Sequence, residues 1–548
     1  MEIQTMKKLE EEALKKSGTD FTRLGFSLFF MIAVLTYSFF SNGGIPNNMF
    51  LAIAALIGAY MAMNIGANDV ANNVGPAVGS KAMTMTMAIV IAAIFEAGGA
   101  LIAGGEVVKT IKKGIIDISA FGGNADPFIW AMMAALLAAA LWLNFATMMK
   151  APVSTTHSIV GGVMGAGIAA AGFSIVSWAT MGKIAASWVI SPVLGGIIAA
   201  AFLFAIKKSI VFQDDKVKAA QKWVPVFVAL MSWAFVTYLT LKGLKKIWPQ
   251  VVEVLNFLPL ISIEMSKKPS LLTALVMGGV VAITIYFVIK AKLTSNKTVL
   301  ENNKASVNTL FTIPLIFAAA LLSFAHGAND VANAIGPLAA INDAVVNGGI
   351  SSKASIPLWV MGVGALGIAL GLALYGPKLI RTVGSEITEL DQIRAFSIAM
   401  AASITVIIAS QLGLPVSSTH IAIGGVFGVG FLREYLHLTD TDTTIEEDKE
   451  TIKDEKTTLH AYQAELKTLE NKAEKSSTEY ERVVELYKLI ADEEKIIKST
   501  KKHIKQIKKV EYVKRDAVKK IIAAWIITVP AAAVLSAVLF YMIRGIMI

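Results

Sequence analysis

The sequence predicts an all-α, polytopic membrane protein with about 12 transmembrane helices and a charged helical hairpin inserted near its C-terminal end. Of its 548 residues, 55% are hydrophobic and 16% are charged, with a mean hydropathy of +0.62. Soluble domains are about a quarter charged. Apolar stretches of roughly 17–25 residues, enough to cross a bilayer, recur along most of the chain. Short alternating strands, which a β-barrel needs, are not found in the sequence.

The apolar stretches follow a polar N-terminus of mixed charge that has no signal-peptide cleavage site, so we expect the first stretch to be a retained helix. Weaker glycine-rich segments raise the predicted number of crossings to twelve or thirteen. The clearest predicted helices are Leu24–Phe40, Thr84–Ala103, Phe128–Met148, Ile184–Ile206, Leu271–Ile289, Leu310–Phe324, Trp359–Tyr375 and Ile522–Met547.

Charge and cysteine content exclude several classes of protein. Cysteine is absent, which excludes disulfides, thiolate metal sites and a cysteine nucleophile. The net charge is +10, but the lysines are scattered between the apolar stretches. Basic loops beside a membrane account for this pattern. The lipid bilayer is therefore a predicted partner, and nucleic acid is not.

Two motifs occur twice, in the same order. "GANDVANN" at Gly66–Asn73 returns as "GANDVANA" at Gly327–Ala334, an offset of 261 residues. "PVSTTH" at Pro152–His157 returns as "PVSSTH" at Pro415–His420, an offset of 263 residues. Two matched motifs at nearly one offset indicate an internal duplication.

A third pair of matched residues reveals an insertion. Trp188 and Trp525 are 337 residues apart, which is 74 more than the offset of 263. The segment Thr441–Lys520 holds 18 acidic and 19 basic side chains in 80 positions, so it cannot lie in hydrocarbon. "SSTE" at Ser476–Glu479 is a capping box that can restart a helix. Apolar residues repeat every seven positions on both sides of this box and predict an antiparallel helical hairpin; a solvated charged linker is the alternative. The repeated positions are Ile452, Leu459 and Leu466, then Val483, Ile490, Ile497 and Ile504.

These features divide the chain into six predicted segments. They are a polar N-terminus with an extra first helix (1–48), a first transmembrane repeat (49–206), connecting helices and basic loops (207–308), a second repeat (309–435), the hairpin insert (436–520) and a final helix completing the second repeat (521–548).

Each repeat places one aspartate among asparagines in an apolar run, Asp69 in the first copy and Asp330 in the second. An ionised carboxylate in a membrane costs at least about 2.5–3.5 kcal/mol, so it needs a partner or a function. Carboxylate and amide oxygens suit a hard cation such as Na⁺. Nearby glycines and prolines predict that both motifs lie where a helix breaks. A buried polar pair that only locks helices together is the alternative, and the duplication argues against it. The predicted cation ligands are Asn68, Asp69, Asn72, Asn329, Asp330 and Asn333.

The Pro-Val-Ser motifs have the composition of helix starts, because proline suits the first turn and serine or threonine caps free N–H groups. A helix N-terminus surrounded by hydroxyl donors can bind an oxyanion. Ordinary helix caps are the alternative. The predicted anion cradle consists of Ser154, Thr155, Thr156, Ser417, Ser418 and Thr419.

Glu96, His157 and His420 are candidates for a proton or ion pathway. Glu96 lies in the middle of an apolar helix, where an acid is costly. His157 and His420 end the Pro-Val-Ser motifs, and a structural role in helix capping is the favoured interpretation. His326 directly precedes the second aspartate motif, but Ile65 takes its place in the first copy. That asymmetry argues against an essential role for His326.

The doubled motifs resemble the duplicated signatures of the inorganic phosphate transporter (PiT) family, over roughly Met49–Arg433 and Lys520–Ile548. The resemblance implies two inverted repeats related by a pseudo-twofold axis, phosphate uptake coupled to Na⁺ or H⁺, and a homodimer. The hairpin insert and the extra first helix depart from the family pattern, and the hairpin's partner is unknown. The resemblance also implies that the ion and phosphate site contains Asp69, Asn72, Asp330 and Asn333, and that the phosphate is lined by Ser154, Thr155, Thr156, Ser417, Ser418 and Thr419.

The predicted function is import of inorganic phosphate across the cell membrane by alternating access, coupled to Na⁺ or H⁺ symport and without another cofactor. Carboxylates alone repel phosphate, so a bound cation is required. A sulfate or metal–phosphate permease of the same fold and a passive anion channel are the alternatives. An enzyme is not predicted, because a symmetric duplication of serine, histidine and aspartate makes little catalytic sense. An ATP-driven pump is not predicted, because no GxxxxGK[ST] loop occurs.

Overall fold

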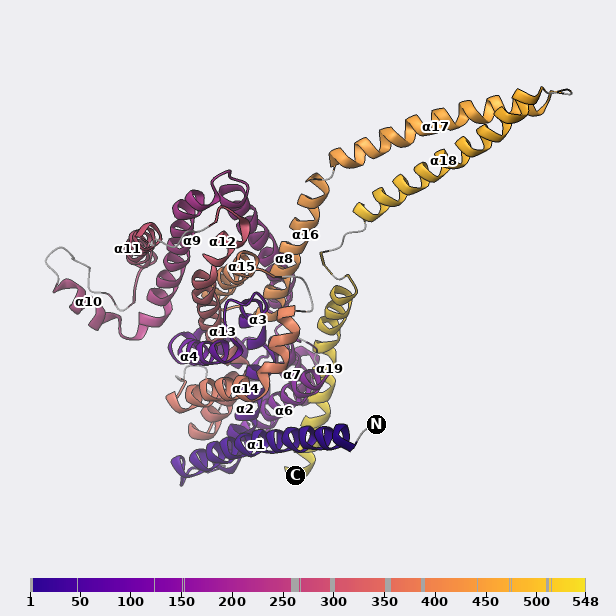
Figure 1. Cartoon of the computed structure of the whole chain (residues 1–548). Helices are drawn as coiled ribbons and strands as arrows, with labels where there is room; N and C mark the ends of the chain where they lie inside the picture. The colour runs from indigo at the N-terminus through magenta and orange to yellow at the C-terminus, as the bar shows by residue number, and fades with distance from the viewer. Residues whose placement is uncertain are drawn as a thin grey trace. The chain divides into compact units, whose positions relative to one another are not determined.

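The computed structural model describes residues 3–46, 48–122, 124–149, 151, 153–257, 266, 268–295, 301–349, 356–385, 390–440, 442–472, 474, 476–508, 512–513 and 515–547. These residues form helices throughout (Figure 1), apart from turns, connecting segments and one isolated β-bridge between Ile116 and Val176. The predicted all-α class is confirmed.

The helices follow one another with short connections through most of the chain (Figure 1). The first half contains α1 (Ile3–Ser41), α2 (Asn48–Asn68), α3 (Val70–Gly79), α4 (Met85–Ala103), α5 (Gly105–Lys113), α6 (Ala125–Met148), α7 (Thr155–Ala171) and α8 (Trp178–Ile206). The central part contains α9 (Lys216–Tyr238), α10 (Trp248–Asn256), α11 (Leu271–Ser295) and α12 (Lys304–Thr309). The remainder contains α13 (Thr312–Val346), α14 (Leu358–Ser385), α15 (Gln392–Gln411), α16 (Ser418–Asp440), α17 (Asp442–Glu470), α18 (Ser477–Lys508) and α19 (Arg515–Met547).

Eleven helical stretches in the described part of the chain are long and apolar enough to cross a membrane. All eight of the clearest predicted helices fall within them, apart from Thr84, which caps α4. The number is close to the predicted 12. Neither α7 nor α16 is among the eleven, and α7 has only 17 residues. Both helices begin inside the protein, at the Pro-Val-Ser motifs.

The two halves of the chain pack in the same pattern. Helix α2 packs on α14 as α13 packs on α4, and α6 packs on α19 as α15 packs on α8. The crossings are close: a Cβ atom added to Gly161 would lie 2.6 Å from the carbonyl oxygen of Val529, and one added to Gly424 would lie 2.2 Å from that of Pro192. These pairs reproduce the offsets of 263 and 337 residues in the sequence. The matched crossings agree with the predicted internal duplication, and the assignment of α19 to the second repeat stays a prediction.

The predicted helix breaks at the aspartate motifs are wrong in the second copy. Helix α13 runs without interruption through Asp330 and Pro337. In the first copy, only Asp69 separates α2 from α3, and its backbone stays helical at φ −80° and ψ −39°. The chain instead leaves the helical path before α7 and α16. Pro415 lies outside α16, two residues before the cap Ser417, so its missing N–H removes no helical hydrogen bond, whereas Pro337 removes one from α13 without ending that helix.

The chain divides into two compact units, Met1–Val429 with Arg515–Ile548, and Gly430–Lys514. In the second unit, α17 and α18 lie side by side as the predicted hairpin (Figure 1). Leu486 and Ile497 of α18 are buried. Arg482 donates to both carboxylate oxygens of Glu465, from Nε at 2.8 Å and from Nη2 at 3.1 Å. The solvated-linker alternative is therefore wrong.

The predicted capping box starts α18. The backbone N–H of Ser476 donates to Glu479 at 2.8 Å, and the N–H of Glu479 donates to Oγ of Ser476 at 3.3 Å. The ammonium of Lys472, together with the Ser476 N–H, lowers the pKa of Glu479 to about 2. Because the pKa of Glu479 is lowered in the folded hairpin, its charge stabilises the fold at pH values above the ordinary pKa of glutamate. This contribution is lost as the pH falls toward 2.

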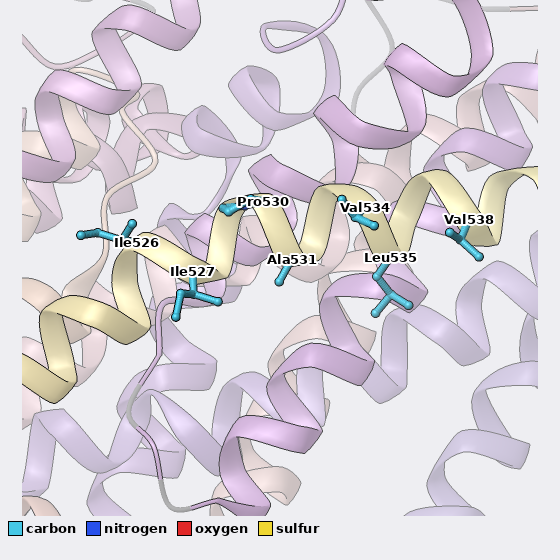
Figure 2. Close-up of a pocket in the computed structure, with 7 residues that line it drawn as sticks. All are labelled: Ile526, Ile527, Pro530, Ala531, Val534, Leu535 and Val538. Atoms are coloured by element: carbon cyan, nitrogen blue, oxygen red, sulfur yellow. The ribbon is translucent and has the colours of Figure 1, made fainter.

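Helix α19 presents an apolar face to its surroundings. This face borders a shallow pocket of about 600 Å³ (Figure 2). Two of its side chains, Ile526 and Val534, are 70% and 66% exposed. Exposed apolar surface of this kind is suited to lipid acyl chains. The pocket is lined by Ile526, Ile527, Pro530, Ala531, Val534, Leu535 and Val538.

Candidate ion and anion site

The two aspartates lie inside the first unit, away from solvent. Asp69 is 1% exposed and Asp330 is 0% exposed. Asp69 joins α2 to α3, and Asp330 lies in the middle of α13. Carboxylates at such depth are stable only with donors or cations beside them.

Both Pro-Val-Ser motifs form helix starts, as predicted, although Pro152 lies outside the described residues. Ser154 caps α7 by accepting the backbone N–H of His157 at 3.0 Å. Ser417 accepts the N–H of His420 at 3.2 Å in the same way. The partial positive charge of a helix N-terminus favours negative groups. Two such termini therefore face the same buried region.

The structure brings the aspartates and the helix starts together across the two repeats. The hydroxyl of Thr155 donates to Oδ2 of Asp69 at 2.6 Å and lies 3.4 Å from Oδ2 of Asp330. Thr419 donates to Oδ1 of Asp69 at 3.1 Å. Ser418 donates to Oδ2 of Asp330 at 3.3 Å. One hydroxyl, that of Thr155, thus lies between the two carboxylates.

The asparagines around the aspartates turn their NH₂ groups toward hydroxyls. Asn72 donates to Thr419 at 2.9 Å, and Asn333 donates to Thr155 and Thr156 at 3.0 and 3.1 Å. Thr156 in turn donates to the carbonyl oxygen of Val416 at 2.9 Å.

Asn68 and Asn329 occupy equivalent places one turn earlier. They donate to Thr147 and Ser410, each at 2.9 Å. The Oδ1 atoms of all four asparagines are buried and accept no hydrogen bond within the described chain. Buried acceptors without donors are rare in folded proteins. A set of buried carboxylate and amide oxygens is the donor set that hard cations prefer.

Two residues of the site were missed by the sequence reasoning. His326 is fully buried, with Nδ1 2.7 Å from Oε2 of Glu96 and Nε2 3.0 Å from Oδ2 of Asp330. Asn73 donates to the other carboxylate oxygen of Glu96 at 2.7 Å. The spacing of His326 and Asp330, four residues apart on one helical face, was the available signal. His326 was missed because the comparison of the repeats discounts a residue that has no counterpart in the first repeat.

Ligand atoms of Asp69, His326 and Asp330 all lie within 4.8 Å of one another, close enough to share one metal ion. Carboxylate oxygens suit Na⁺ or Mg²⁺, and an added imidazole nitrogen suits a transition metal. The geometry alone therefore leaves both classes of cation open.

His157 and His420 lie in a buried row of rings beside the helix starts. Their ring centroids are 4.5 Å apart. His157 packs on Trp188 at 3.9 Å, and His420 stacks on Trp525 at 3.7 Å. Their backbone N–H groups, and not their rings, take part in the helix caps. A pathway role for Glu96, His157 or His420 stays a prediction.

Comparison with known proteins shows which of them this chain is similar to. Residues 65–536 match the sequence profile of the phosphate transporter family. A Helicobacter pylori (strain J99) protein named a phosphate permease is 48% identical over 544 residues, 98% of each chain. A Thermococcus kodakarensis protein named likewise is 39% identical over 385 residues, 70% of this chain and 89% of its own length. A solved structure named "The sodium-dependent phosphate transporter" superposes with a TM-score of 0.69 at 30% identity, covering 91% of this chain and 99% of that chain.

The region that matches the family profile contains both aspartates, both helix starts and ten of the eleven candidate spans in whole or in part. The relatives are named as permeases or transporters, and the similarity to the Helicobacter pylori protein extends over nearly the whole chain. This multi-pass integral membrane protein is not an enzyme, and it belongs to the phosphate transporter family.

Proposed function

We propose that this protein imports inorganic phosphate by Na⁺ symport, with the cations at Asp69 and Asp330 and the anion at the N-termini of α7 and α16. The observation that carries the proposal is the hydroxyl of Thr155 between the two carboxylates, 2.6 and 3.4 Å away. It joins the cation ligands to the anion cradle. Family membership and the sodium dependence for which the solved relative is named support the same function.

Coupling follows from competition for hydroxyl protons. Each serine or threonine hydroxyl has one proton to donate. The hydroxyls of Thr155, Ser418 and Thr419 donate to carboxylates, so they cannot donate to phosphate at the same time. A Na⁺ ion bound at Asp69 replaces the donors Thr155 and Thr419, and a Na⁺ ion at each carboxylate neutralises the charge that repels the anion. The released hydroxyls and the free N–H groups at the N-termini of α7 and α16 then donate hydrogen bonds to phosphate. Alternating access moves one repeat against the other around the filled site.

Uptake by the purified protein in liposomes tests this function. Labelled phosphate should accumulate under an inward Na⁺ gradient and not when K⁺ replaces Na⁺, and excess sulfate should not compete. Uptake driven by a proton gradient without Na⁺ would overturn the choice of coupling ion. Equally strong competition by sulfate would overturn the substrate, and uptake without any cation gradient would favour a passive channel.

A metal–phosphate complex is a second candidate substrate, because the Asp69–His326–Asp330 cluster includes an imidazole nitrogen. In that case, uptake of labelled Zn²⁺ should rise with phosphate in the same liposomes. Phosphate uptake that is unchanged by a metal chelator would remove this candidate.

Replacing Thr155 by Ala should raise the KM for phosphate by about tenfold, since a hydrogen bond to a charged group contributes about 1.5–3 kcal/mol. The Na⁺ concentration for half-maximal uptake should change less, because Asp69 keeps the donor from Thr419. Thr155→Ser retains the hydroxyl and is the matched control, and serine is the residue at the equivalent position, Ser418. An unchanged KM in Thr155→Ala would remove this hydroxyl from the phosphate site.

Removing residues 442–508, with a short flexible linker in their place, should leave the uptake rate within about twofold of the full chain, since compact units fold separately. The hairpin helices belong to the second unit, and the ligands proposed above belong to the first. Uptake per molecule of folded protein is the measurement, with monodispersity in detergent as the control. Loss of uptake in well-folded protein would show that the hairpin takes part in transport.

A further inference from the structure

The candidate site is polar on the side of Asp330, where three buried polar side chains lie next to one another, and the side of Asp69 has no equivalent of them. Glu96 receives Nδ2 of Asn73 on one carboxylate oxygen and faces Nδ1 of His326 with the other, each at 2.7 Å. These three side chains are at most 1% exposed. The contacts continue to Asp330, where Nε2 of His326 lies 3.0 Å from Oδ2. We refer to Asn73, Glu96 and His326 as the polar triad.

The equivalent positions beside Asp69 are all apolar. The offset of 261 residues between the aspartate motifs pairs His326 with Ile65 and Asn73 with Ala334. Helix packing pairs Glu96 with Ile368, as the glycines of the two motifs show. An apolar triad of Ile65, Ala334 and Ile368 therefore takes the place of the polar triad.

The pairing of Glu96 with Ile368 comes from matched helix crossings. A Cβ atom on Gly66 would lie 1.9 Å from the carbonyl oxygen of Ile368. A Cβ atom on Gly327 would lie 2.2 Å from the carbonyl oxygen of Glu96. Gly66 and Gly327 are themselves 261 residues apart, so the residues they touch are equivalent. The two sides of the site thus share a backbone arrangement and differ in polarity.

This difference gives the two aspartates unequal hydrogen bonding. Both oxygens of Asp69 accept a threonine hydroxyl. The contacts of Asp330 with His326, Thr155 and Ser418 all fall on Oδ2, and the shortest is that with His326. Its Oδ1 is buried and accepts no hydrogen bond from the described residues. A buried carboxylate oxygen without a donor can receive a cation at once, whereas the oxygens of Asp69 must first release a hydroxyl.

We propose that His326, oriented by Glu96, is a positioning residue that directs Oδ1 of Asp330 toward a Na⁺ ion and makes the two cation positions unequal. The ion at Asp330 binds first, because it displaces no hydrogen bond. The ion at Asp69 binds second and releases hydroxyls that phosphate receives. This order rests on the proposed Na⁺–phosphate symport.

Binding of radiolabelled Na⁺ to the purified protein without phosphate tests the inference. The wild type should bind one ion tightly and a second only weakly until phosphate is added. His326→Ile, which installs the residue of the first repeat, should weaken the first ion by about tenfold, the effect of one contact to a charged group. The KM for phosphate at saturating Na⁺ should change by less than about twofold. His326→Gln, whose amide can donate to Asp330, should recover most of the Na⁺ affinity.

A double-substitution cycle separates positioning from direct binding. Glu96→Ile installs the residue of the equivalent position and should weaken Na⁺ binding by itself. It should add nothing in the His326→Ile background, because Glu96 acts through His326. Ile65→Val is the matched control beside Asp69 and should bind Na⁺ like the wild type.

The outcomes distinguish this inference from the proposed function. Unchanged Na⁺ affinity in His326→Ile, additive effects of the two substitutions, or two equally tight ions in the wild type would overturn the inference alone. Phosphate uptake by the wild type that needs no Na⁺ would overturn the proposed coupling, and the inference with it.

Discussion

Asp69→Asn is expected to reduce Na⁺-driven phosphate uptake by at least about a hundredfold, because removing one partner of a buried charge pair costs about 3–5 kcal/mol and each 1.4 kcal/mol is a factor of ten. Asparagine has nearly the same size and still accepts a hydrogen bond from Thr155, so the fold should persist. It carries no charge, however, and cannot neutralise a cation in a region where Asp69 is only 1% exposed. Uptake into liposomes at equal amounts of inserted protein is the measurement.

Asp330→Asn should have an effect of the same size, since Asp330 is the equivalent residue and is fully buried. Asp391→Asn is the matched control. Asp391 caps α15 by accepting the backbone N–H of Arg394 at 2.9 Å, and asparagine caps helices equally well. Its uptake should equal that of the wild type. Normal uptake in both Asp69→Asn and Asp330→Asn would disprove a cation site at the aspartates.

Gly99→Ala is expected to destabilise the folded protein by about 3 kcal/mol or more, at or above the upper end of the range for overpacked cores. A Cβ atom at this position would lie 2.0 Å from the carbonyl oxygen of Phe324 and 2.8 Å from its carbonyl carbon. Both atoms belong to the backbone of α13, which cannot rotate away as a side chain can. Helices α4 and α13 must therefore separate, which also pulls Glu96 away from His326.

Gly98→Ala is the control for this prediction, because it makes the same substitution one residue earlier on α4. Its Cβ atom would lie 3.8 Å from the ring of Phe324, an ordinary packing distance. The melting temperature in detergent and the yield of monodisperse protein should fall for Gly99→Ala and stay near wild type for Gly98→Ala. Equal melting temperatures for the two variants would show that the crossing of α4 and α13 can widen without cost.

Most of the candidate site could be predicted from the sequence, since its residues occur in two duplicated motifs. Thr155, Ser418 and Thr419 contact the carboxylates, as their place in the predicted cradle suggests. Ser154 and Ser417 instead cap the helices with their side chains. A serine at a helix start has the same sequence signature in both roles. Only the direction of its hydroxyl distinguishes them.

The polar triad could not be predicted by comparing the repeats, because that comparison finds only what the two copies share. His326 and Glu96 are 230 residues apart and differ from their counterparts. The helix breaks were misplaced for a related reason. Glycine and proline near Asp330 are compatible with a break, but the glycine serves a close helix crossing and the proline is accommodated within α13.

The sequence by itself determined the membrane class, the duplication, the hairpin insert and the residue types of the site. These follow from hydropathy, periodicity and repeated motifs, which act over short stretches of chain. Tertiary structure decided which hydroxyl meets which carboxylate and why Asp330 differs from Asp69. Those contacts join helices far apart in the chain, several of them from different repeats. They therefore depend on how closely the helices cross, and the distances between helices are set by packing across the whole membrane unit.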